Sequence, residues 1–461
     1  MVFPEELILE LDTLISGLIR EQSSIGFTLG IRDQEQSLFT KSYGRLEINS
    51  PGEVNEESLF SIGSISKSFT VLSILILAEQ GKLNIDDPIS KYLPLKLNGR
   101  EQQIKLRHLM SHSSGLPNIH LCVIIEKMTG IRPDYQALPI SMDLKTWTDL
   151  FDYINEQGEF ITTEPGERFH YSDTSFSLLQ YVIQHVSGMT YHEFVKNHIF
   201  QPLEMNRATF RSKFFGDSNT TRGHLHSTQT TDGIQATPSN YPGSELVDGG
   251  GGVMASNNDM MNYLSMMMHK GTYNGNQLIS EKSYELLITP CVDVMPEIGF
   301  SYAFGWFVIK SKDVTMIAHT GNTGASTSII AFIPDKNLGI LFMNNLNIPP
   351  MPIFRKIRDI VSHYNPNYSP SHIIERFEEY VGHYEGVGSL EALKILHEDE
   401  KIIFKFSKVT VNSVRSYSVP VVHNDFGYFV VLNGEDLRVI ADIHNGRKMI
   451  TIGFNKFKKV D

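Results

Sequence analysis

The sequence predicts an α/β protein of the α+β type, in which helices and a run of short strands precede a small antiparallel β unit. Residues 64–80 are strongly apolar and contain no proline or glycine, which is typical of a buried helix that ends at Gly81. Between residues 302 and 344, short apolar segments follow one another as successive strands do. Beyond residue 370 the pattern changes to short alternating segments, which favours a small antiparallel barrel or sandwich.

The composition is that of a folded protein. The chain has 461 residues, of which 41% are hydrophobic and 20% charged, so disorder, coiled coil and collagen are excluded. Lys and Arg number 40 against 52 Asp and Glu, which gives a formal net charge of −12. A surface of that sign repels nucleic acid and anionic lipid, so we expect no nucleic-acid partner and no membrane partner.

The cysteines and the N-terminal residues indicate the compartment. Cys122 and Cys291 cannot form a disulfide framework, and no metal-ligand spacing accompanies them. Residues 1–20 carry acidic side chains where a signal peptide needs an uncharged run, so they predict an amphipathic helix. The longest mostly apolar run, residues 71–78, is too short to span a membrane. We expect a cytoplasmic protein, or a periplasmic or secreted one if a leader has been removed.

The remaining elements follow from their patterns in chain order. Residues 26–43 alternate weakly, which predicts a pair of strands with a polar turn near Asp33. Residues 118–147 have no clear period and suggest an excursion that could act as a lid. Residues 211–248 are polar and rich in turn formers, which predicts a long surface loop. The other expected elements are helices at 176–186 and 191–199, a tight glycine run at 249–252, and strands at 302–310, 315–319, 326–332 and 339–344.

A domain boundary is expected near residue 364. Residues 352–363 predict a helix with its proline at the start, and residues 365–370 have the composition of a linker. After the linker, apolar and polar residues alternate at 402–406 and 437–443. The pairs Asn433-Gly434 and Asn445-Gly446 are typical hairpin turns. The chain therefore divides into domains 1–364 and 365–461.

Ser64 and Lys67 form an S-x-x-K pair at the start of the apolar helix. Side chains three apart share a helix face, so the lysine amine can reach the serine hydroxyl. A serine becomes a nucleophile when a neighbouring base takes its proton, and burial lowers the pKa of a lysine so that it can be that base. An exposed helix start with an ordinary lysine is the alternative for an isolated pair.

Two further segments carry candidate residues. Tyr171 follows a Pro-Gly turn, and beside a cationic lysine its phenol would ionise more readily and could act as base and acid. His319-Thr320-Gly321-Asn322 ends an expected strand, where the N–H of Asn322 could complete an oxyanion hole with that of Ser64. Taken alone, a tyrosine is more often buried with its hydroxyl bonded, and such a glycine often marks a simple strand-to-turn junction.

Together and in this order, these pieces resemble the serine β-lactamase and penicillin-binding-protein superfamily, and within it the class C-like branch of β-lactamases, DD-peptidases, esterases and D-amino-acid-specific peptidases. The likeness covers roughly residues 5–360 and is specific as an ordered set. It includes the segments 61–67, 83–88, 92–94, 107–117, 202–205, 249–252 and 305–306. The segment 380–384 resembles, over a shorter stretch, the start of a lipocalin-like barrel that many of these hydrolases carry at their C-terminus.

The resemblance implies a fold, a reaction and roles for residues. It implies a two-lobed domain, with an antiparallel sheet and a helical lobe, followed by the small β-barrel. Ser64 would be the acylated nucleophile, Lys67 its partner and Tyr171 the general base and acid. The N–H groups of Ser64 and Asn322 would hold the oxyanion. The family needs no metal and no cofactor, and its substrates are small esters, amides or peptides.

Two departures from the family pattern concern the substrate. Asp173 stands where an asparagine is common, and an ionised aspartate only accepts hydrogen bonds. It would keep Lys67 charged, which favours Tyr171 as the working base and weakens binding of a β-lactam amide. His319 stands where β-lactamases have lysine, and an imidazole with a pKa of about 6.5 is mostly neutral at pH 7. Both departures point away from an efficient β-lactamase. We expect an esterase or peptidase, and we expect its rate to rise toward alkaline pH as Tyr171 loses its proton.

Two other functions stay open. One is a penicillin-binding DD-peptidase or weak β-lactamase. The other is a catalytically silent homologue that serves as a scaffold or peptide-binding module. The sequence also leaves homo-oligomerisation open.

The remaining histidine patterns favour structural roles. His224 and His226 could share a strand face, but no third metal ligand accompanies them. His108 and His112 lie four residues apart without the glutamate of a zinc protease motif, so packing or capping is expected.

Overall fold

The computed structural model describes most of the chain up to residue 348 and the strands that follow. The described ranges are residues 9–10, 12–13, 25–116, 145–156, 163–213, 216–230, 233–239, 245–296, 299–310 and 314–348, together with strands between residues 382 and 459. The predicted N-terminal helix lies mostly outside the described residues. The predicted lid, the helix at 352–363, the linker at 365–370 and the two Asn-Gly turns lie wholly or almost wholly outside them.

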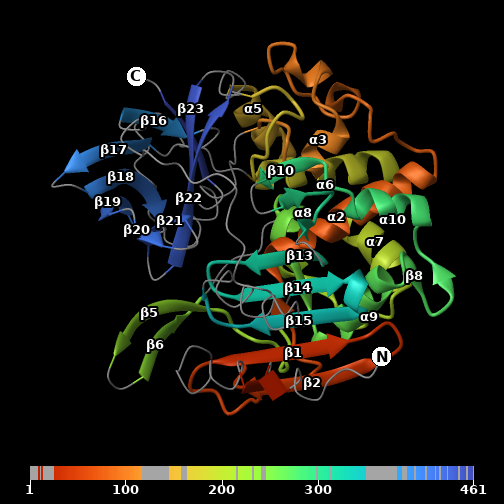
Figure 1. The fold of residues 1–461 in the computed structure, drawn as a ribbon. Coiled ribbons are helices and arrows are strands. Elements are labelled where there is room, and N and C mark those ends of the chain that lie inside the picture. The colour runs from red at the N-terminus through yellow and green to blue at the C-terminus, as the bar shows by residue number, and fades with distance from the viewer. Residues whose placement is uncertain are drawn as a thin grey trace.

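The centre of the structure is an antiparallel sheet with the order β10-β11-β12-β13-β14-β15-β1-β2. In Figure 1 the strands β13, β14, β15, β1 and β2 lie one below another, with helices α2 and α6 above them. Neighbouring residues of β14 point to opposite faces, so Ile329 belongs to one apolar cluster and Ile330 to the other. The strand is buried along its whole length, which shows that both faces of the sheet are covered. The strand bounds are β1 Gly26–Arg32, β2 Ser37–Gly44, β10 Val292–Met295, β11 Phe300–Tyr302, β12 Phe307–Lys310, β13 Thr315–Asn322, β14 Thr327–Ile333 and β15 Leu338–Asn344.

The helical part packs around α2, which is buried on all sides along most of its length. The helices α6, α7, α8 and α10 pack against it, which explains why its apolar stretch has little amphipathic character. A π-helix, Lys196–Phe200, continues α7. The helix bounds are α2 Ser66–Glu79, α3 Leu106–Met110, α5 Trp147–Glu156, α6 Asp173–Ser187, α7 Tyr191–Val195, α8 Asp248–Gly251, α9 Asn257–Met268 and α10 Glu281–Ile288.

Small sheets connect distant segments. The strands β3 Phe60–Ser61, β7 Val253–Ala255 and β4 Thr209–Phe210 form a three-stranded sheet. Because β3 comes just before Ser64 and β7 just after the glycine run, their pairing fixes these two segments side by side. The hairpins are β5 His224–Thr230 with β6 Gly233–Pro238, and β8 Thr272–Tyr273 with β9 Asn276–Gln277.

The α/β prediction is confirmed, with two corrections within the first 348 residues. Residues 211–248 are not one long loop, because β5 and β6 form a hairpin that extends from the sheet in Figure 1. Backbone pairing drives this polar segment into strands despite its turn-rich composition. The single strand expected at 302–310 is instead two, β11 and β12, joined by a turn at Gly305, whose φ is +75°.

The C-terminal strands form a second antiparallel sheet with the order β19-β18-β17-β16-β24-β23-β22-β21-β20. The alternating segments at 402–406 and 437–443 lie in β18 and β22, as predicted. No ladder joins β19 to β20 in the described part of this sheet, so closure into a barrel stays a prediction. The bounds are β16 Gly382–Gly386, β17 Ala392–Glu398, β18 Lys401–Thr410, β19 Ser413–Pro420, β20 Val422–Asn424, β21 Gly427–Leu432, β22 Glu435–His444, β23 Arg447–Ile452 and β24 Asn455–Lys459.

Substitution of Phe69 tests how much the packing of α2 contributes to the stability of the core. Its ring is fully buried and stacks on Tyr263 with a centroid distance of 4.3 Å. We expect Phe69→Ala to lower the free energy of unfolding by about 3–5 kcal/mol, measured by chemical denaturation. Met189→Ala, at an exposed site, should change it by less than about 0.5 kcal/mol. Equal effects of the two substitutions would contradict this account of the core.

Candidate active site

Ser64 lies where the chain turns from β3 into α2. It is in a short 3-10 turn, Gly63–Ile65, and is half-buried while its neighbours are buried. Gly63 has a φ of +53°, and a Cβ there would lie 2.8 Å from the backbone nitrogen of Asn322. A side chain at residue 63 would therefore push β13 away, so the glycine lets the Ser64 turn approach the end of that strand.

Lys67 points to Ser64 from the first turn of α2. Its side chain is fully buried, and its Nζ donates to Ser64 Oγ at 3.1 Å. Nζ also donates to Asp173 Oδ1 at 2.5 Å and to the carbonyl oxygen of Gly250 at 2.8 Å. Burial lowers the pKa of Lys67, and the contact with Asp173 opposes this only in part. Lys67 can therefore lose its proton more easily than an exposed lysine.

Tyr171 completes the group, because its hydroxyl is hydrogen-bonded to Ser64 and its ring centroid lies 4.8 Å from Lys67 Nζ. The structure therefore brings together the three side chains that the sequence predicted. The expectation that the phenol ionises more readily is wrong. Burial, with the negative charge of Asp173 as a further cause, raises the pKa of Tyr171 well above its ordinary value. The resting phenol is protonated and can donate.

Asp173 begins α6, directly after the N-cap Ser172. Its carboxylate reaches Lys67 from the helix end, which supports the predicted pairing of these two residues. The side chain is about one-fifth exposed, at 21%. Asp173 therefore lies between the buried amine and the open side of the site.

The end of β13 forms the opposite wall. Gly321 leaves room for the Ser64 turn, because a Cβ there would lie 1.9 Å from the carbonyl oxygen of Ile62. The side chain of Asn322 is held by Asn347, 2.8 Å away, which orients this end of the strand. The backbones of Ser64 and Asn322 thus belong to adjoining segments, and their role as oxyanion donors stays a prediction.

His319 is buried beneath this wall. Its Nδ1 lies 2.7 Å from the carbonyl oxygen of Thr320, and its Nε2 lies 3.1 Å from the Tyr302 hydroxyl. Both contacts fit a neutral ring that donates through Nδ1 and accepts through Nε2. Burial, with the charge of Lys67 as a further cause, lowers the pKa of His319 to about 3. At neutral pH the ring carries no charge with which to attract a substrate carboxylate.

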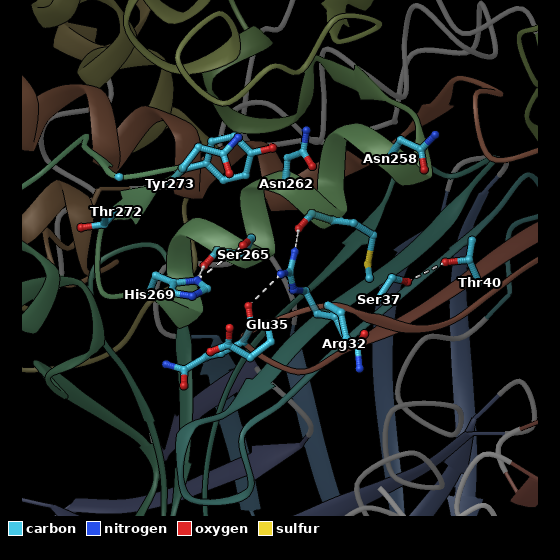
Figure 2. A pocket seen from close by; sticks show the side chains of 15 residues that line it. Arg32, Glu35, Ser37, Thr40, Asn258, Asn262, Ser265, His269, Thr272 and Tyr273 are labelled. Carbon is cyan, nitrogen blue, oxygen red and sulfur yellow. Dashed lines mark hydrogen bonds between the residues drawn. The ribbon is translucent and has the colours of Figure 1, made fainter. Parts of the chain in front are cut away.

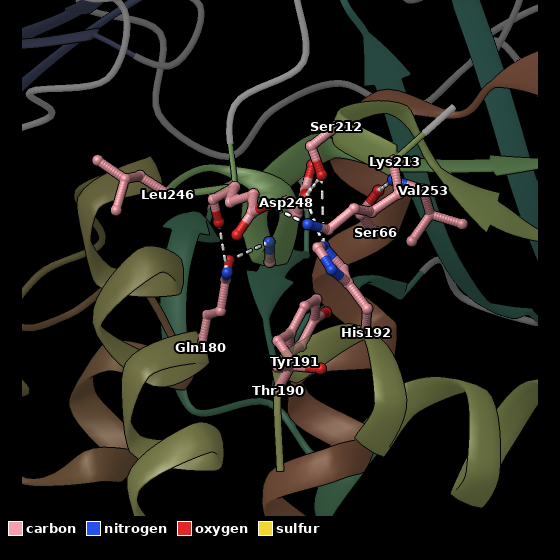
Figure 3. Close-up of polar contacts among 12 residues, drawn as sticks. Ser66, Gln180, Thr190, Tyr191, His192, Ser212, Lys213, Leu246, Asp248 and Val253 are labelled. Atoms are coloured by element: carbon pink, nitrogen blue, oxygen red, sulfur yellow. Dashed lines mark hydrogen bonds and ion pairs between the residues drawn. The ribbon is translucent and has the colours of Figure 1, made fainter. Parts of the chain in front are cut away.

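A fully buried carboxylate, that of Asp248, supports the glycine run, and the sequence analysis did not identify it. Figure 3 shows Asp248 between His192 and Ser212. His192 Nε2 lies 2.7 Å from Asp248 Oδ2, and the Ser212 hydroxyl donates to the same oxygen. Asp248 begins the short α8 turn that includes Gly250, so these contacts hold the carbonyl that Lys67 uses. Only the glycine run itself marked this region in the sequence.

A polar hollow of about 550 Å³ lies at the other end of the strands (Figure 2). It lies between the β1–β2 turn and α9, and Arg32 and Ser265 are among its lining residues. Arg32 pairs with Gly339 at one end of β15. Asn322, at the end of β13 beside Ser64, pairs with Thr327, which pairs with Asn344 at the opposite end of β15. The lining residues include none of the Ser64 group, so this hollow is separate from the candidate active site.

The other histidines have structural contacts. Within the described ranges, no group of three or more His, Cys, Asp or Glu side chains could hold a metal ion. His224 Nε2 accepts from the backbone N–H of Ile48, and its Nδ1 contacts the carbonyl oxygen of Asn345. His108 Nδ1 accepts from the N–H of Lys105, which confirms the predicted capping role.

No helix in the described part of the chain is long and apolar enough to cross a membrane.

Comparison with known proteins decides the family. The family model described as Beta-lactamase matches residues 11–363. The chain belongs to the beta-lactamase family. The relative named "Putative penicillin-binding protein PbpX", from Bacillus subtilis (strain 168), is 31% identical over 291 residues, which is 63% of this chain and 65% of that protein. Protein flp of Staphylococcus aureus (strain MW2) is 24% identical over 354 residues, 74% of this chain and 64% of that protein. The chain therefore matches less than two thirds of the length of these relatives.

A solved structure of another protein shares this fold. The beta-lactamase family chain aligns with the octameric penicillin-binding protein homologue from Pyrococcus abyssi with a TM-score of 0.69. The alignment covers 98% of this chain and 100% of the other, at 23% sequence identity. At that identity the likeness shows the fold, including the C-terminal sheet, and not the activity.

The protonation of His319 predicts how acid affects stability. The unfolded chain takes up this proton near pH 6.5 and the folded protein only near pH 3, so acidification within that window favours unfolding. Each such proton changes the free energy of unfolding by up to about 1.4 kcal/mol per pH unit. We expect His319→Gln, which keeps an acceptor for Tyr302, to make the acid loss shallower by up to that amount. An unchanged slope in denaturation curves across the window would contradict the buried neutral ring.

Proposed function

We propose that this beta-lactamase family member is a serine hydrolase that forms an acyl ester on Ser64. The observation that carries the proposal is the contact of Ser64 Oγ with both the Lys67 amine and the Tyr171 hydroxyl. Nucleophile, base and acid must lie within hydrogen-bond reach for acyl transfer, and these three groups do.

The pKa directions divide the roles between Lys67 and Tyr171. A neutral amine can donate to Asp173 and Gly250 and still accept the Ser64 proton across the same 3.1 Å. Burial lowers the pKa of Lys67 and raises that of Tyr171, so it favours a neutral amine, which can accept a proton, and a protonated phenol, which can donate one. This reverses the order expected from the sequence.

In the proposed reaction, Lys67 takes the Ser64 proton as Oγ attacks the substrate carbonyl carbon. The N–H groups of Ser64 and Asn322 would stabilise the oxyanion. Tyr171 donates its proton to the leaving group as the old acyl bond breaks, and regains one from the Lys67 ammonium. A water molecule then attacks the Ser64 ester while the neutral Lys67 amine takes its proton, and the ammonium returns that proton to Ser64 Oγ as the carboxylic acid leaves.

We propose carboxylic esters and small amides or peptides, D-residues included, as the substrates. The neutral His319 and the acceptor-only Asp173 both disfavour a substrate whose carboxylate must be bound near β13. The second candidate is a penicillin-binding DD-peptidase or weak β-lactamase, which the similarity to PbpX favours. Labelling with a fluorescent penicillin separates the two candidates.

A homo-oligomer is also proposed, because the Pyrococcus abyssi homologue is octameric.

Ser64→Ala tests the nucleophile. Without the hydroxyl no acyl ester forms, so we expect hydrolysis of a p-nitrophenyl ester to fall by about 10⁴-fold or more. Ser73→Ala is the matched control, since this serine of α2 bonds to the carbonyl of Phe69 and not to Lys67. Ser64→Ala should also abolish labelling by a fluorophosphonate probe. Wild-type turnover in this variant would end the assignment, and an unlabelled wild type would favour the silent-scaffold alternative.

The pH profile tests the base. Because neutral Lys67 is the active form, kcat/KM should rise with pH along a one-proton limb centred below 10.5, the ordinary pKa of lysine. Lys67→Arg keeps the charge at all working pH values, so that variant should lose the limb and most of its rate. A wild-type profile that is flat from about pH 6 to pH 10 would contradict a titrating base.

A further inference from the structure

His112 is hydrogen-bonded to the backbone on both sides of Tyr171. The N–H of His170 donates to the carbonyl oxygen of His112 at 2.6 Å. The N–H of Ser172 donates to His112 Nδ1 at 3.0 Å. The two chain neighbours of Tyr171 are therefore bonded to the same residue, one to its backbone and one to its ring.

The Tyr171 ring itself lies against His112. The ring centroids are 4.2 Å apart with an interplanar angle of 31°. A tyrosine in a loop has two free side-chain torsions, and this contact restricts them by packing. With the two flanking hydrogen bonds, His112 defines both the backbone and the ring of Tyr171.

His112 is in turn rigidly held. It follows α3, is fully buried and has a φ of +55°, a conformation that a non-glycine residue adopts at a cost in energy. The rings of Phe176 and Tyr302 lie 4.9 Å from its own, and that of Phe169 lies 5.7 Å away. The surrounding structure maintains the unusual backbone, which is often found at functional positions.

The hydrogen bonds also fix the proton of His112. Because Nδ1 accepts from Ser172, a neutral ring carries its proton on Nε2. Burial, then the charge of Lys67, lowers the pKa of His112 well below its ordinary value, so the ring is neutral. Nε2 has no hydrogen-bond partner among the described residues and lies within the aromatic cluster. The ring thus makes no hydrogen bond through Nε2, while through Nδ1 it holds the backbone at Ser172, next to Tyr171.

We propose that His112 is a positioning residue that holds the Tyr171 hydroxyl at the distance needed for proton transfer. The inference rests on the role proposed above for Tyr171. His112 contacts no reacting atom in this account and acts only through the tyrosine. A displacement of a catalytic group by about 1 Å can cost about 100-fold in rate, so a residue that fixes the loop has a large effect.

Two substitutions at His112 distinguish the effect of its aromatic ring from the effect of its Nδ1 acceptor. His112→Phe keeps an aromatic ring against Tyr171 but removes the acceptor for Ser172, and we expect kcat to fall by about 100-fold with little change in KM. His112→Asn places an oxygen near the former Nδ1 and tolerates the positive φ, so it should recover part of that loss. His198→Phe, on the helix that follows α7, is the matched control with unchanged kcat.

A double-mutant cycle with Tyr171→Phe shows whether His112 acts through the tyrosine. Without the phenol, His112→Phe should change the residual rate by less than about twofold, because the residue it positions is already inactive. A full additional loss in the Tyr171→Phe background would overturn the proposal and show a general structural effect. If Ser64→Ala instead stays active, the proposed function fails whatever the cycle gives.

Hydrogen exchange on the unmodified protein keeps the test valid if the variants do not fold. The amides of His170 and Ser172 should exchange slowly, although they lie in the loop before α6, because each donates to buried His112. Fast exchange at both amides, resolved to single residues by fragmentation, would overturn the proposal.

Discussion

The burial of the Lys67 amine is the constraint on which the rest of the site depends. A buried amine is stable only if its hydrogen-bonding capacity is met, and two of the three partners of Lys67 come from distant parts of the chain. Asp173 reaches it from the start of α6 and Gly250 from the glycine turn, while Ser64 lies in the 3-10 turn just before α2. The pairing of β3 with β7 and the Asp248 cluster hold the glycine turn in place. Packing of α2 against α6 and the glycine turn therefore also assembles the candidate catalytic group.

The sequence predicted elements better than their exact connections. The α2 helix and the strands β13 to β15 were predictable because long apolar stretches leave few alternatives. The β5–β6 hairpin was not, because its polar residues carry the signature of a loop and only backbone pairing makes them strands. The turn that separates β11 from β12 was hidden by the apolar residues on both sides of it. Closure of the C-terminal sheet stays a prediction, because its edge strands β19 and β20 share no ladder in the described part although they follow one another in the chain.

The site was predictable in membership and less so in electrostatics. Ser64, Lys67 and Tyr171 were identified from their motifs and lie together in the structure. The pKa of Tyr171 was expected to fall because only the charge of Lys67 was considered, whereas burial and Asp173 dominate. His112 was expected to be a packing or capping residue. Its two bonds to the neighbours of Tyr171 join segments about sixty residues apart, and no local pattern reveals them.

The most direct measurement is the identity of the covalent intermediate. Rapid acid quench of the protein during turnover of a p-nitrophenyl ester, followed by peptide mass spectrometry, locates any acyl group. The account predicts a single acyl group on Ser64 in the unmodified protein, and none in a folded Lys67→Arg variant quenched at the same time. Turnover with the acyl group on another residue, or with Ser64 acylated as quickly in Lys67→Arg, would contradict it.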